Sequence, residues 1–270
     1  MDISNICVIG DDKRMDYAAE ELYTLGFDVY REEKYINNRS MIVLAPPADE
    51  KMTRRIIPYL EYGQFLYAGA MSNRLKHQCE LMQIEYVDYL KIDELTKKNA
   101  ILTAKGIIKC ALSDGAILDS SDNADTITSE KRCLVAGYGF CGKALAKALT
   151  DENINAKVDV LVRRKELKGE IESNGYGFID LNNVYSYDLN NISVVFNTIP
   201  AMIFNERLLK HFNHDTKFFD IASGDGGIDY SFCNENNIFA KQYLGIPGKE
   251  FPVEAGKAIA ETIIYDINLR

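Results

Sequence analysis

Three glycines, Gly137, Gly139 and Gly142, stand in G-x-G-x-x-G spacing within the segment KRCLVAGYGFCGKALAKAL. An apolar run typical of a strand precedes them, a helical pattern follows, and KVDVLV supplies the second strand of a βαβ unit. In such a turn the first glycine permits the sharp bend, the second lets backbone approach a pyrophosphate, and the third allows close packing between strand and helix. Phe140 and Cys141 would add backbone N–H donors where the helix begins. The segment therefore predicts a dinucleotide site, the alternative being a glycine-rich turn without a ligand.

A run of basic residues follows the second strand of this unit, at Arg163, Arg164 and Lys165. A site for NAD usually has an acidic residue here, which holds the ribose 2′-hydroxyl. Guanidinium groups offer paired donors to phosphate oxygens, so these cations favour the 2′-phosphate of NADP(H). The alternative is a solvated basic loop, and Glu166 would weaken the case for NADP(H) if it turned inward.

Two further apolar runs, SVVFNTIP and KFFDIASGDGG, are typical of buried strands in the same sheet. In open α/β sheets, ligands bind outside the carboxyl ends of the strands. A plain turn is an equally good interpretation for each residue taken alone. The residues assigned to the cofactor in this part of the chain are Asn197, Thr198, Ile199, Pro200, Ala222 and Pro247.

Strand patterns alternating with helical patterns over residues 1–95 predict a first α/β lobe with a parallel sheet, flavodoxin-like or Rossmann-like. A long helical pattern and the polar segment SSDNADTITSE separate it from a second lobe, an NAD(P)-binding Rossmann domain. The predicted domains are residues 1–127, including a connecting helix at about 97–118; residues 128–252; and a C-terminal helix, 253–270, packing back toward the first lobe.

Composition and charge narrow the class of protein. With 47% hydrophobic and 26% charged residues, the 270-residue chain has an ordinary soluble globular composition. Its net charge of −9 disfavours nucleic acid as a partner, and its longest apolar run is the five residues 41–45, too short for a membrane span. Six cysteines without a CxxC predict free thiols in the cytoplasm, and His77, His211 and His214 are too scattered for a metal site.

Several motifs together resemble the family of the A subunit of dipicolinate synthase, an enzyme of spore-forming bacteria. These are GYGFCGKALAKAL, VRR, FNTIPAMIFN, FFDIASGDGG with IDY, and GIPGKEFPVEAGKAIAETI, and in the N-terminal half VIGDDKR, AGAMSN and NAILTAKG. The resemblance implies a catalytic N-terminal lobe and NADP-dependent oxidation of dihydrodipicolinate to dipicolinate during sporulation, in the mother cell. It also implies a partner, a flavoprotein-like B subunit, and we expect a homo-oligomer.

A dicarboxylate substrate needs cations, hydroxyls and backbone N–H groups around it. Within the family motifs, the residues assigned to it are Arg14, Ser72, Asn73 and Ser223, with Lys105 as a replacement contact. Alternatively, Arg14 only occupies the first turn of a helix, and Ser72 with Asn73 caps one. No residue identifies itself as the general base.

This chain departs from the family pattern at two places. Lys105 stands where the family has an acidic residue, and Gly224 with Asp225 stands where it has a basic residue and proline. One hypothesis is that Lys105 and Asp225 form an ion pair. The departures leave two alternatives open: another NADP-linked dehydrogenase of the same plan, which would require a His or Lys beside the nicotinamide, and a nucleotide-binding subunit without turnover.

Overall fold

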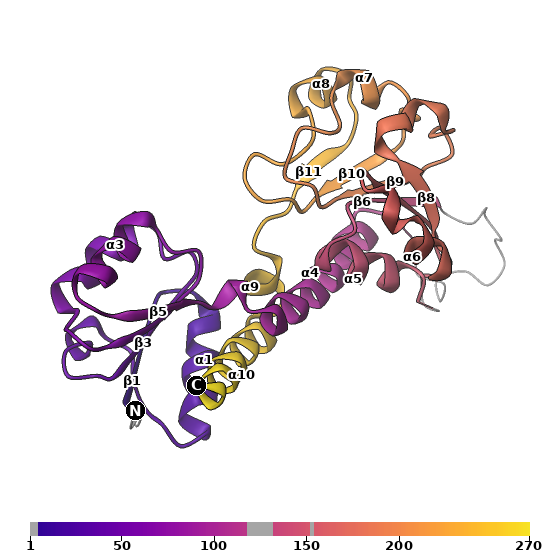
Figure 1. Cartoon of the computed structure of the whole chain (residues 1–270). Coiled ribbons are helices and arrows are strands. Elements are labelled where there is room, and N and C mark those ends of the chain that lie inside the picture. Colours follow the sequence, from indigo (N-terminus) through magenta and orange to yellow (C-terminus); the bar gives the residue numbers. More distant parts are fainter. Residues whose placement is uncertain (1–4, 118–131, 152–153) are drawn as a thin grey trace. The chain divides into compact units, whose positions relative to one another are not determined.

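The computed structural model describes residues 5–117, 132–151 and 154–270, and its contacts divide the chain into two compact units (Figure 1). The first unit contains residues 1–99 and 247–270, and the second contains residues 100–246. The division falls inside helix α4 (Asp93–Ser113), whereas the sequence placed the domain boundary at residue 127. Two acidic residues in its first turn favour the early start of α4. The helix ends at Ser113, before the end expected at residue 118, and residues 114–117 are not helical.

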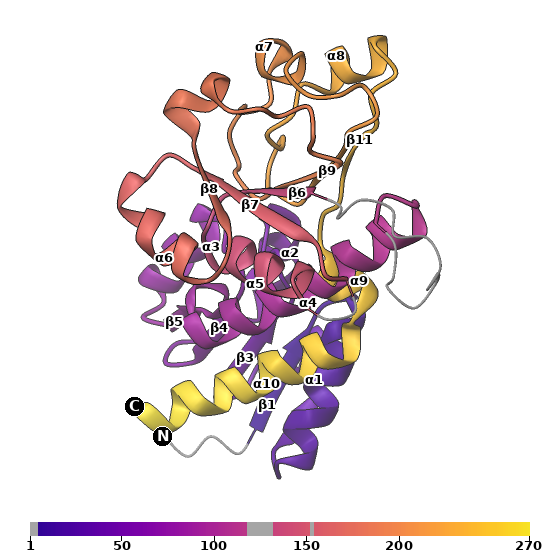
Figure 2. The same cartoon turned by 90° about the vertical axis from the view of Figure 1, so that its right-hand side faces the viewer.

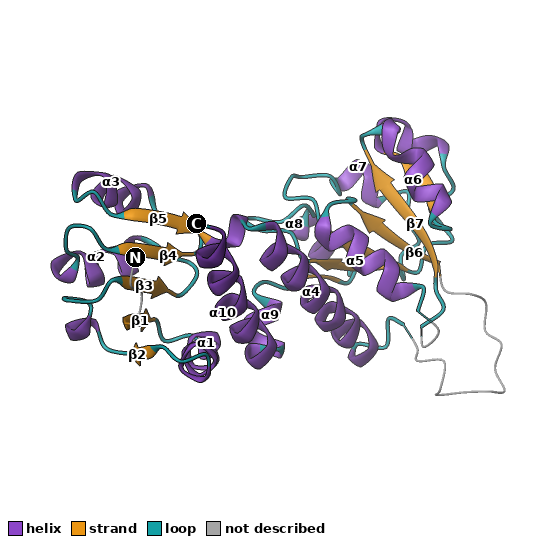
Figure 3. Cartoon of the chain, turned by 60° about the horizontal axis from the view of Figure 1, so that its bottom comes forward, coloured by secondary structure: helices purple, strands orange, loops and turns teal. Residues whose placement is uncertain are grey.

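The first unit is built on a five-stranded parallel sheet with the strand order β2-β1-β3-β4-β5, drawn as orange arrows in Figure 3. This is the flavodoxin-like order, whose topological switch point lies between β1 and β3. Strands β3 and β4 are buried along their whole length, which accounts for their unbroken apolar sequences. The strands are β1 (Asn5–Ile9), β2 (Asp28–Tyr30), β3 (Met41–Leu44), β4 (Phe65–Ala68) and β5 (Glu85–Asp88).

Helices from both parts of the sequence cover this sheet. Helix α10 packs along α1, the two lying side by side in Figure 2. Gly256 makes this approach possible, because a Cβ there would lie 2.4 Å from the carbonyl oxygen of Arg14. The helices of this unit besides the start of α4 are α1 (Lys13–Thr24), α2 (Glu50–Ile56), α3 (Asn73–Leu81), α9 (Ile246–Glu250, shared with the second unit) and α10 (Pro252–Leu269); the 3₁₀ turns are η1 (Glu33–Tyr35), η2 (Ile57–Tyr59) and η3 (Tyr89–Lys91).

The apolar face of α10 belongs to the core of the first unit, so we expect it to be necessary for that unit's stability. Ile263 is fully buried in this core. We expect Ile263→Ala to lower the free energy of unfolding by about 2–5 kcal/mol, the usual cost of truncating a buried large aliphatic side chain. Urea denaturation followed by circular dichroism measures it. Leu269→Ala, at a side chain that is 69% exposed on the same helix, is the control and should change stability by less than about 0.5 kcal/mol; equal losses from both variants would contradict the prediction.

The second unit contains a six-stranded parallel sheet with the order β11-β10-β9-β6-β7-β8. Counted from β6, this is the order 3-2-1-4-5-6 of a dinucleotide-binding Rossmann fold, so the predicted fold class is confirmed. Strands β8 and β11 were not predicted from the sequence, because they are short edge strands without a long apolar run. The strands are β6 (Arg132–Ala136), β7 (Lys157–Val162), β8 (Gly177–Asp180), β9 (Val194–Asn197), β10 (Lys217–Asp220) and β11 (Ala240–Gln242).

Both faces of this sheet are buried. Alternate residues of β6 belong to different cores: Val135 packs with Ile107 of α4 and Leu145 of α5, whereas Leu134 packs with residues on the opposite face. Among the described helices, none is long and apolar enough to cross a membrane. Besides the rest of α4, the helices are α5 (Phe140–Leu149), α6 (Lys168–Ser173), α7 (Glu206–Leu209) and α8 (Tyr230–Glu235), with 3₁₀ turns η4 (Lys165–Leu167) and η5 (Leu181–Ser186).

Candidate nucleotide site

The three glycines between β6 and α5 have three different environments. Gly137 has a φ of +96°, and a Cβ there would lie 2.2 Å from Thr198 Oγ1. A Cβ on Gly142 would lie 2.1 Å from the carbonyl oxygen of Gly137, whereas one on Gly139 would meet nothing within 4 Å. Gly137 thus makes the turn, Gly139 leaves open space, and Gly142 allows the helix to lie close to the turn. A pyrophosphate-binding turn requires these three features in this order.

Helix α5 begins directly at this turn, with Gly139 as its N-cap and no side chain capping it. Its first N–H groups are therefore available to an anion, whose charge the helix dipole favours. Phe140 and Cys141 are the first two residues of α5, as expected. Burial raises the pKa of the Cys141 thiol, which disfavours the reactive thiolate form.

A pocket of about 310 Å³ adjoins this turn, within the range of about 300–1,000 Å³ usual for ligand pockets. It lies at the carboxyl ends of β6, β7 and β9, and the switch point of the second sheet is between β6 and β9. No carboxylate lines it in the described part of the chain. Its lining residues are Gly137, Tyr138, Val162, Arg163, Arg164, Leu181, Ile199, Ala201 and Ile203.

The basic run after β7 divides into two parts. Arg163 and Arg164 are exposed and line the pocket, whereas Lys165 forms an ion pair of 3.1 Å with Asp180 at the end of β8. Burial alone would raise the pKa of Asp180, but the backbone N–H of Asn182 and the Lys165 ammonium hold it below its usual value. Two of the three cations assigned to the 2′-phosphate are thus at the pocket, and Lys165 is held by a carboxylate.

The turn after β9 contains residues that contact the pocket and residues that support it. Thr198 is bonded to the glycine turn through its Oγ1, which donates to the carbonyl oxygen of Ala136 at 2.8 Å. Ile199 lines the pocket, and Pro200 beside it is exposed. Asn197, which we expected to line the cleft, is fully buried and hydrogen-bonded to backbone and to a neighbouring strand.

A buried carboxylate that the sequence analysis did not single out organises the next loop. Asp220, the last residue of β10, is fully buried and accepts four hydrogen bonds, two from the loop that follows it, one from the end of β9 and one from the start of α8. The sequence pattern that could have identified it is an acidic residue at the end of an apolar strand, directly before a glycine-rich loop. In this loop, Ala222, which was assigned to the cofactor, is buried, and Ser223, which was assigned to the substrate, is exposed. Pro247 lies in α9 of the first unit and is not among the residues that line this pocket.

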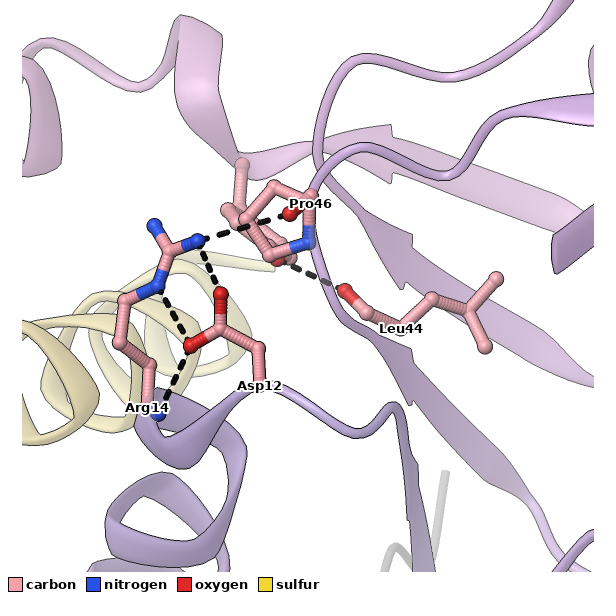
Figure 4. A network of polar contacts seen from close by, with 5 residues as sticks. Asp12, Arg14, Leu44 and Pro46 are labelled. Carbon is pink, nitrogen blue, oxygen red and sulfur yellow. Dashed lines mark hydrogen bonds and ion pairs between the residues drawn. The ribbon is translucent and has the colours of Figure 1, made fainter. Parts of the chain in front are cut away.

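The substrate residues assigned to the first unit already have intramolecular partners. The Arg14 guanidinium forms a two-pronged ion pair with Asp12, and its Nη2 also lies 3.5 Å from the carbonyl oxygen of Pro46 (Figure 4). A Cβ on Gly248 would lie 2.6 Å from Arg14 Nε. These contacts lie at the β1/β3 switch point, and there the Arg14 charge is balanced by Asp12.

Ser72 is the N-cap of α3, accepting the N–H of Leu75 at 3.1 Å, and its hydroxyl also lies 2.8 Å from that of Thr53. Asn73, the first residue of this helix, is exposed. The capping alternative therefore describes Ser72. In the second unit, Lys105 is exposed on α4, and no ion pair joins it to Asp225 within the described residues. No group of three or more metal-ligating side chains is found among the described residues either.

The Asp12 carboxylate should make stability depend on pH. Burial alone would raise the pKa of Asp12, but its hydrogen bonds from Arg14 hold it below the usual value. Its contribution is therefore present above the unfolded-state pKa of about 3.9 and is lost as the pH falls through the lower folded-state value. We expect Asp12→Asn, which retains the helix cap, to be less stable than wild type at pH 7, with the difference shrinking below about pH 4.

Urea unfolding between pH 7 and pH 3 measures this difference. Asp225→Asn, at an exposed carboxylate, is the control and should follow the wild-type curve. A destabilisation of the Asp12 variant that stayed constant down to pH 3 would show that the ion pair does not carry the effect.

The chain resembles known proteins in both sequence and fold. No family model matches the chain. Its sequence is 24% identical over 198 residues to the A subunit of dipicolinate synthase from Bacillus subtilis (strain 168), a match covering 73% of this chain and 63% of that protein, less than two thirds of its length. The crystal structure of the A subunit of dipicolinate synthase from Bacillus halodurans has a TM-score of 0.82 at 21% identity, covering 98% of this chain and 97% of that one.

The same fold occurs in a dehydrogenase solved with its cofactor. The NAD-complexed D-isomer specific 2-hydroxyacid dehydrogenase of Lactobacillus delbrueckii ssp. bulgaricus has a TM-score of 0.59 at 12% identity, covering 98% of this chain and 97% of that one. The resemblance to the A subunit of dipicolinate synthase that the sequence motifs indicated is thus confirmed both by sequence similarity and by the fold of the chain.

Proposed function

We propose that this chain is an oxidoreductase that uses NADP(H). One observation carries the proposal: the glycine turn and two arginines, Arg163 and Arg164, border the same pocket. Within the described residues, no carboxylate lines this pocket or forms an ion pair with either arginine. The turn fits a pyrophosphate, and the arginines suit a 2′-phosphate, for which a guanidinium provides two parallel donors. The dehydrogenase folds of similar structures support the assignment as an oxidoreductase.

The proposed reaction is the oxidation of dihydrodipicolinate to dipicolinate, as the likeness to the A subunit of dipicolinate synthase suggests. The partly reduced ring loses a hydride and a proton and becomes aromatic, which supplies much of the driving force. The bound nicotinamide would accept the hydride at C4. The protein's task is then chiefly to orient the two rings and to bind two carboxylates, so that positioning supplies most of the catalysis.

We also propose a cellular location, an oligomeric state and a partner for this protein. We place it in the cytoplasm of the mother cell of a spore-forming bacterium, as a homo-oligomer that works with a flavoprotein-like B subunit. The relative from Bacillus subtilis is named as one subunit of its synthase, which supports the existence of such a partner.

The cofactor is tested first, by calorimetric titration of the purified protein with NADPH and separately with NADH. Calorimetry is preferable to intrinsic fluorescence because the chain has no tryptophan. We expect NADPH to bind at least tenfold more tightly, which corresponds to about 1.4 kcal/mol. Binding of neither nucleotide would overturn the oxidoreductase proposal, and equal binding would overturn the choice of NADP(H).

The reaction is tested next by supplying dihydrodipicolinate and NADP⁺ and following NADPH absorbance and dipicolinate formation together. We expect the two products in equal amounts. If nucleotide binds but dihydrodipicolinate is not oxidised, a panel of 2-hydroxy acids distinguishes another dehydrogenase from a protein without turnover.

A second candidate function is a subunit that binds nucleotide without catalysing a reaction. The contacts of two residues in the first unit favour it. Arg14 is neutralised by Asp12, and Ser72 caps α3, so two of the groups assigned to substrate carboxylates already have partners. This candidate predicts tight NADPH binding with no product from any substrate of the panel, with or without an added B subunit.

A further inference from the structure

Asp220 is the buried carboxylate at the carboxyl end of β10. Its Oδ1 accepts the Asn197 side-chain amide at 3.0 Å and the Ala222 N–H at 2.9 Å. Its Oδ2 accepts the Gly227 N–H at 2.7 Å and the Tyr230 hydroxyl at 2.9 Å. No cation pairs with it in the described part of the chain. A buried charge without a counter-ion is costly unless it is fully hydrogen-bonded, and here four donors satisfy it.

The donor set requires a carboxylate. An ionised carboxylate has about four acceptor sites and no donor, which suits four converging donors, whereas a carboxamide replaces one oxygen with a donating NH₂ group. Of the four partners of Asp220, only the Tyr230 hydroxyl can turn and accept a hydrogen bond. An asparagine at this position would therefore direct its NH₂ toward Tyr230 and leave the Gly227 N–H without an acceptor.

Gly227 connects Asp220 to the wall of the nucleotide pocket. Its carbonyl oxygen accepts the N–H groups of Ile203 at 3.1 Å and of Phe204 at 2.9 Å. A Cβ at this glycine would lie 2.7 Å from the carbonyl oxygen of Ala201, so backbone packs directly against backbone. Ile203 and Ala201 both line the pocket.

Asn197 makes the second connection. Its Nδ2 donates to the carbonyl oxygen of Ile199 at 3.0 Å, and its Oδ1 accepts the Ile199 N–H at 3.1 Å. The same Nδ2 donates to Asp220, which fixes the orientation of the amide. Ile199 is the third apolar residue on this side of the pocket.

We infer that Asp220 is a positioning residue, which holds the pocket wall formed by Ile199, Ala201 and Ile203 in the shape that receives the nucleotide. The inference deepens the proposed function and rests on it for the identity of the ligand. Asp220 itself acts through Gly227 and Asn197, and it is not among the residues that line the pocket.

The test compares Asp220→Asn with Asp159→Asn in the full-length protein. Asp159 is a matched control, because it is 5% exposed, ion-paired with Arg132 in the same unit, and not among the residues that line the pocket. Calorimetry measures NADPH affinity, and circular dichroism melting measures stability. We expect both variants to melt at a lower temperature, but only Asp220→Asn to lose affinity for NADPH, by about tenfold or more.

A second readout needs no nucleotide. Amide hydrogen exchange should be faster in Asp220→Asn than in wild type at Gly227, Ile203 and Phe204, relative to β6 of the same sheet, and unchanged there in Asp159→Asn. If wild type bound no nucleotide, the proposed function would fail, while this exchange pattern would still decide whether Asp220 holds the wall.

Three results would overturn the inference: wild-type affinity in a folded Asp220→Asn, an equal loss of affinity in Asp159→Asn, or unchanged exchange at Gly227. If Asp220→Asn does not fold, Tyr230→Phe decides, because it removes one donor and keeps the carboxylate. We expect that variant to weaken NADPH binding about two- to fivefold, and wild-type affinity in it would contradict the inference.

Discussion

Gly142→Ala should abolish tight nucleotide binding. The new Cβ would lie 2.1 Å from the carbonyl oxygen of Gly137 and 2.8 Å from its carbonyl carbon, and backbone atoms cannot rotate away as a side chain can. Either the turn opens or the N-terminus of α5 moves, and both changes misplace the N–H groups that would face the pyrophosphate. We expect the Kd for NADPH to rise at least about 100-fold, or about 2.7 kcal/mol, in a calorimetric titration.

Gly169→Ala is the matched control for this substitution. Gly169 lies in α6, and a Cβ there would meet nothing within 4 Å. Alanine should stabilise that helix by about 0.5–1 kcal/mol and leave nucleotide affinity unchanged. Nucleotide affinity of Gly142→Ala within a few-fold of wild type, in a protein with a native circular dichroism spectrum, would show that this turn does not bind the pyrophosphate.

Replacing Arg163 and Arg164 together by serine should remove the preference for NADPH over NADH. Both arginines line the pocket, and a hydrogen bond to a charged group contributes about 1.5–3 kcal/mol. We expect NADPH affinity to fall about 10- to 100-fold, while NADH affinity changes by less than about threefold, because NADH has no 2′-phosphate. The ratio of the two dissociation constants, measured by calorimetry, is the quantity that tests the prediction.

Arg207→Ser controls for the loss of positive charge in the same unit. Arg207 stacks over Tyr185 and is not among the residues that line the pocket. Its variant should retain the wild-type ratio. If the double variant kept its preference for NADPH, the selectivity would have to come from other groups, and the assignment of these two arginines would be wrong.

The part of the site that the sequence predicts is local in the chain. The spacing of Gly137, Gly139 and Gly142 specifies a turn whose atoms all come from one short segment, so its geometry follows from residue type and the flanking strand and helix. The buried parallel strands were predictable for a similar reason, since a strand covered on both faces is apolar at every position.

The parts that the sequence did not predict depend on contacts between distant segments. Lys165 belongs to a basic run, but its partner Asp180 is supplied by β8, a strand too short and too polar to stand out. The role of Asn197 depends on Asp220, which is 23 residues away in the chain and comes alongside only when β9 and β10 pair. Residue type alone cannot show which polar groups a fold will use internally.

The order in which the two units can fold during synthesis follows from the way the sequence is divided between them. Residues 100–246 form one continuous unit, whereas the first unit is interrupted by them and is completed only by residues 247–270. During synthesis the second unit can therefore become compact while the first still lacks α10, which supplies Ile259 and Ile263 to its core. The part of the chain that is translated first is thus completed last, because the core positions that α10 fills stay empty until residues 247–270 have been synthesised.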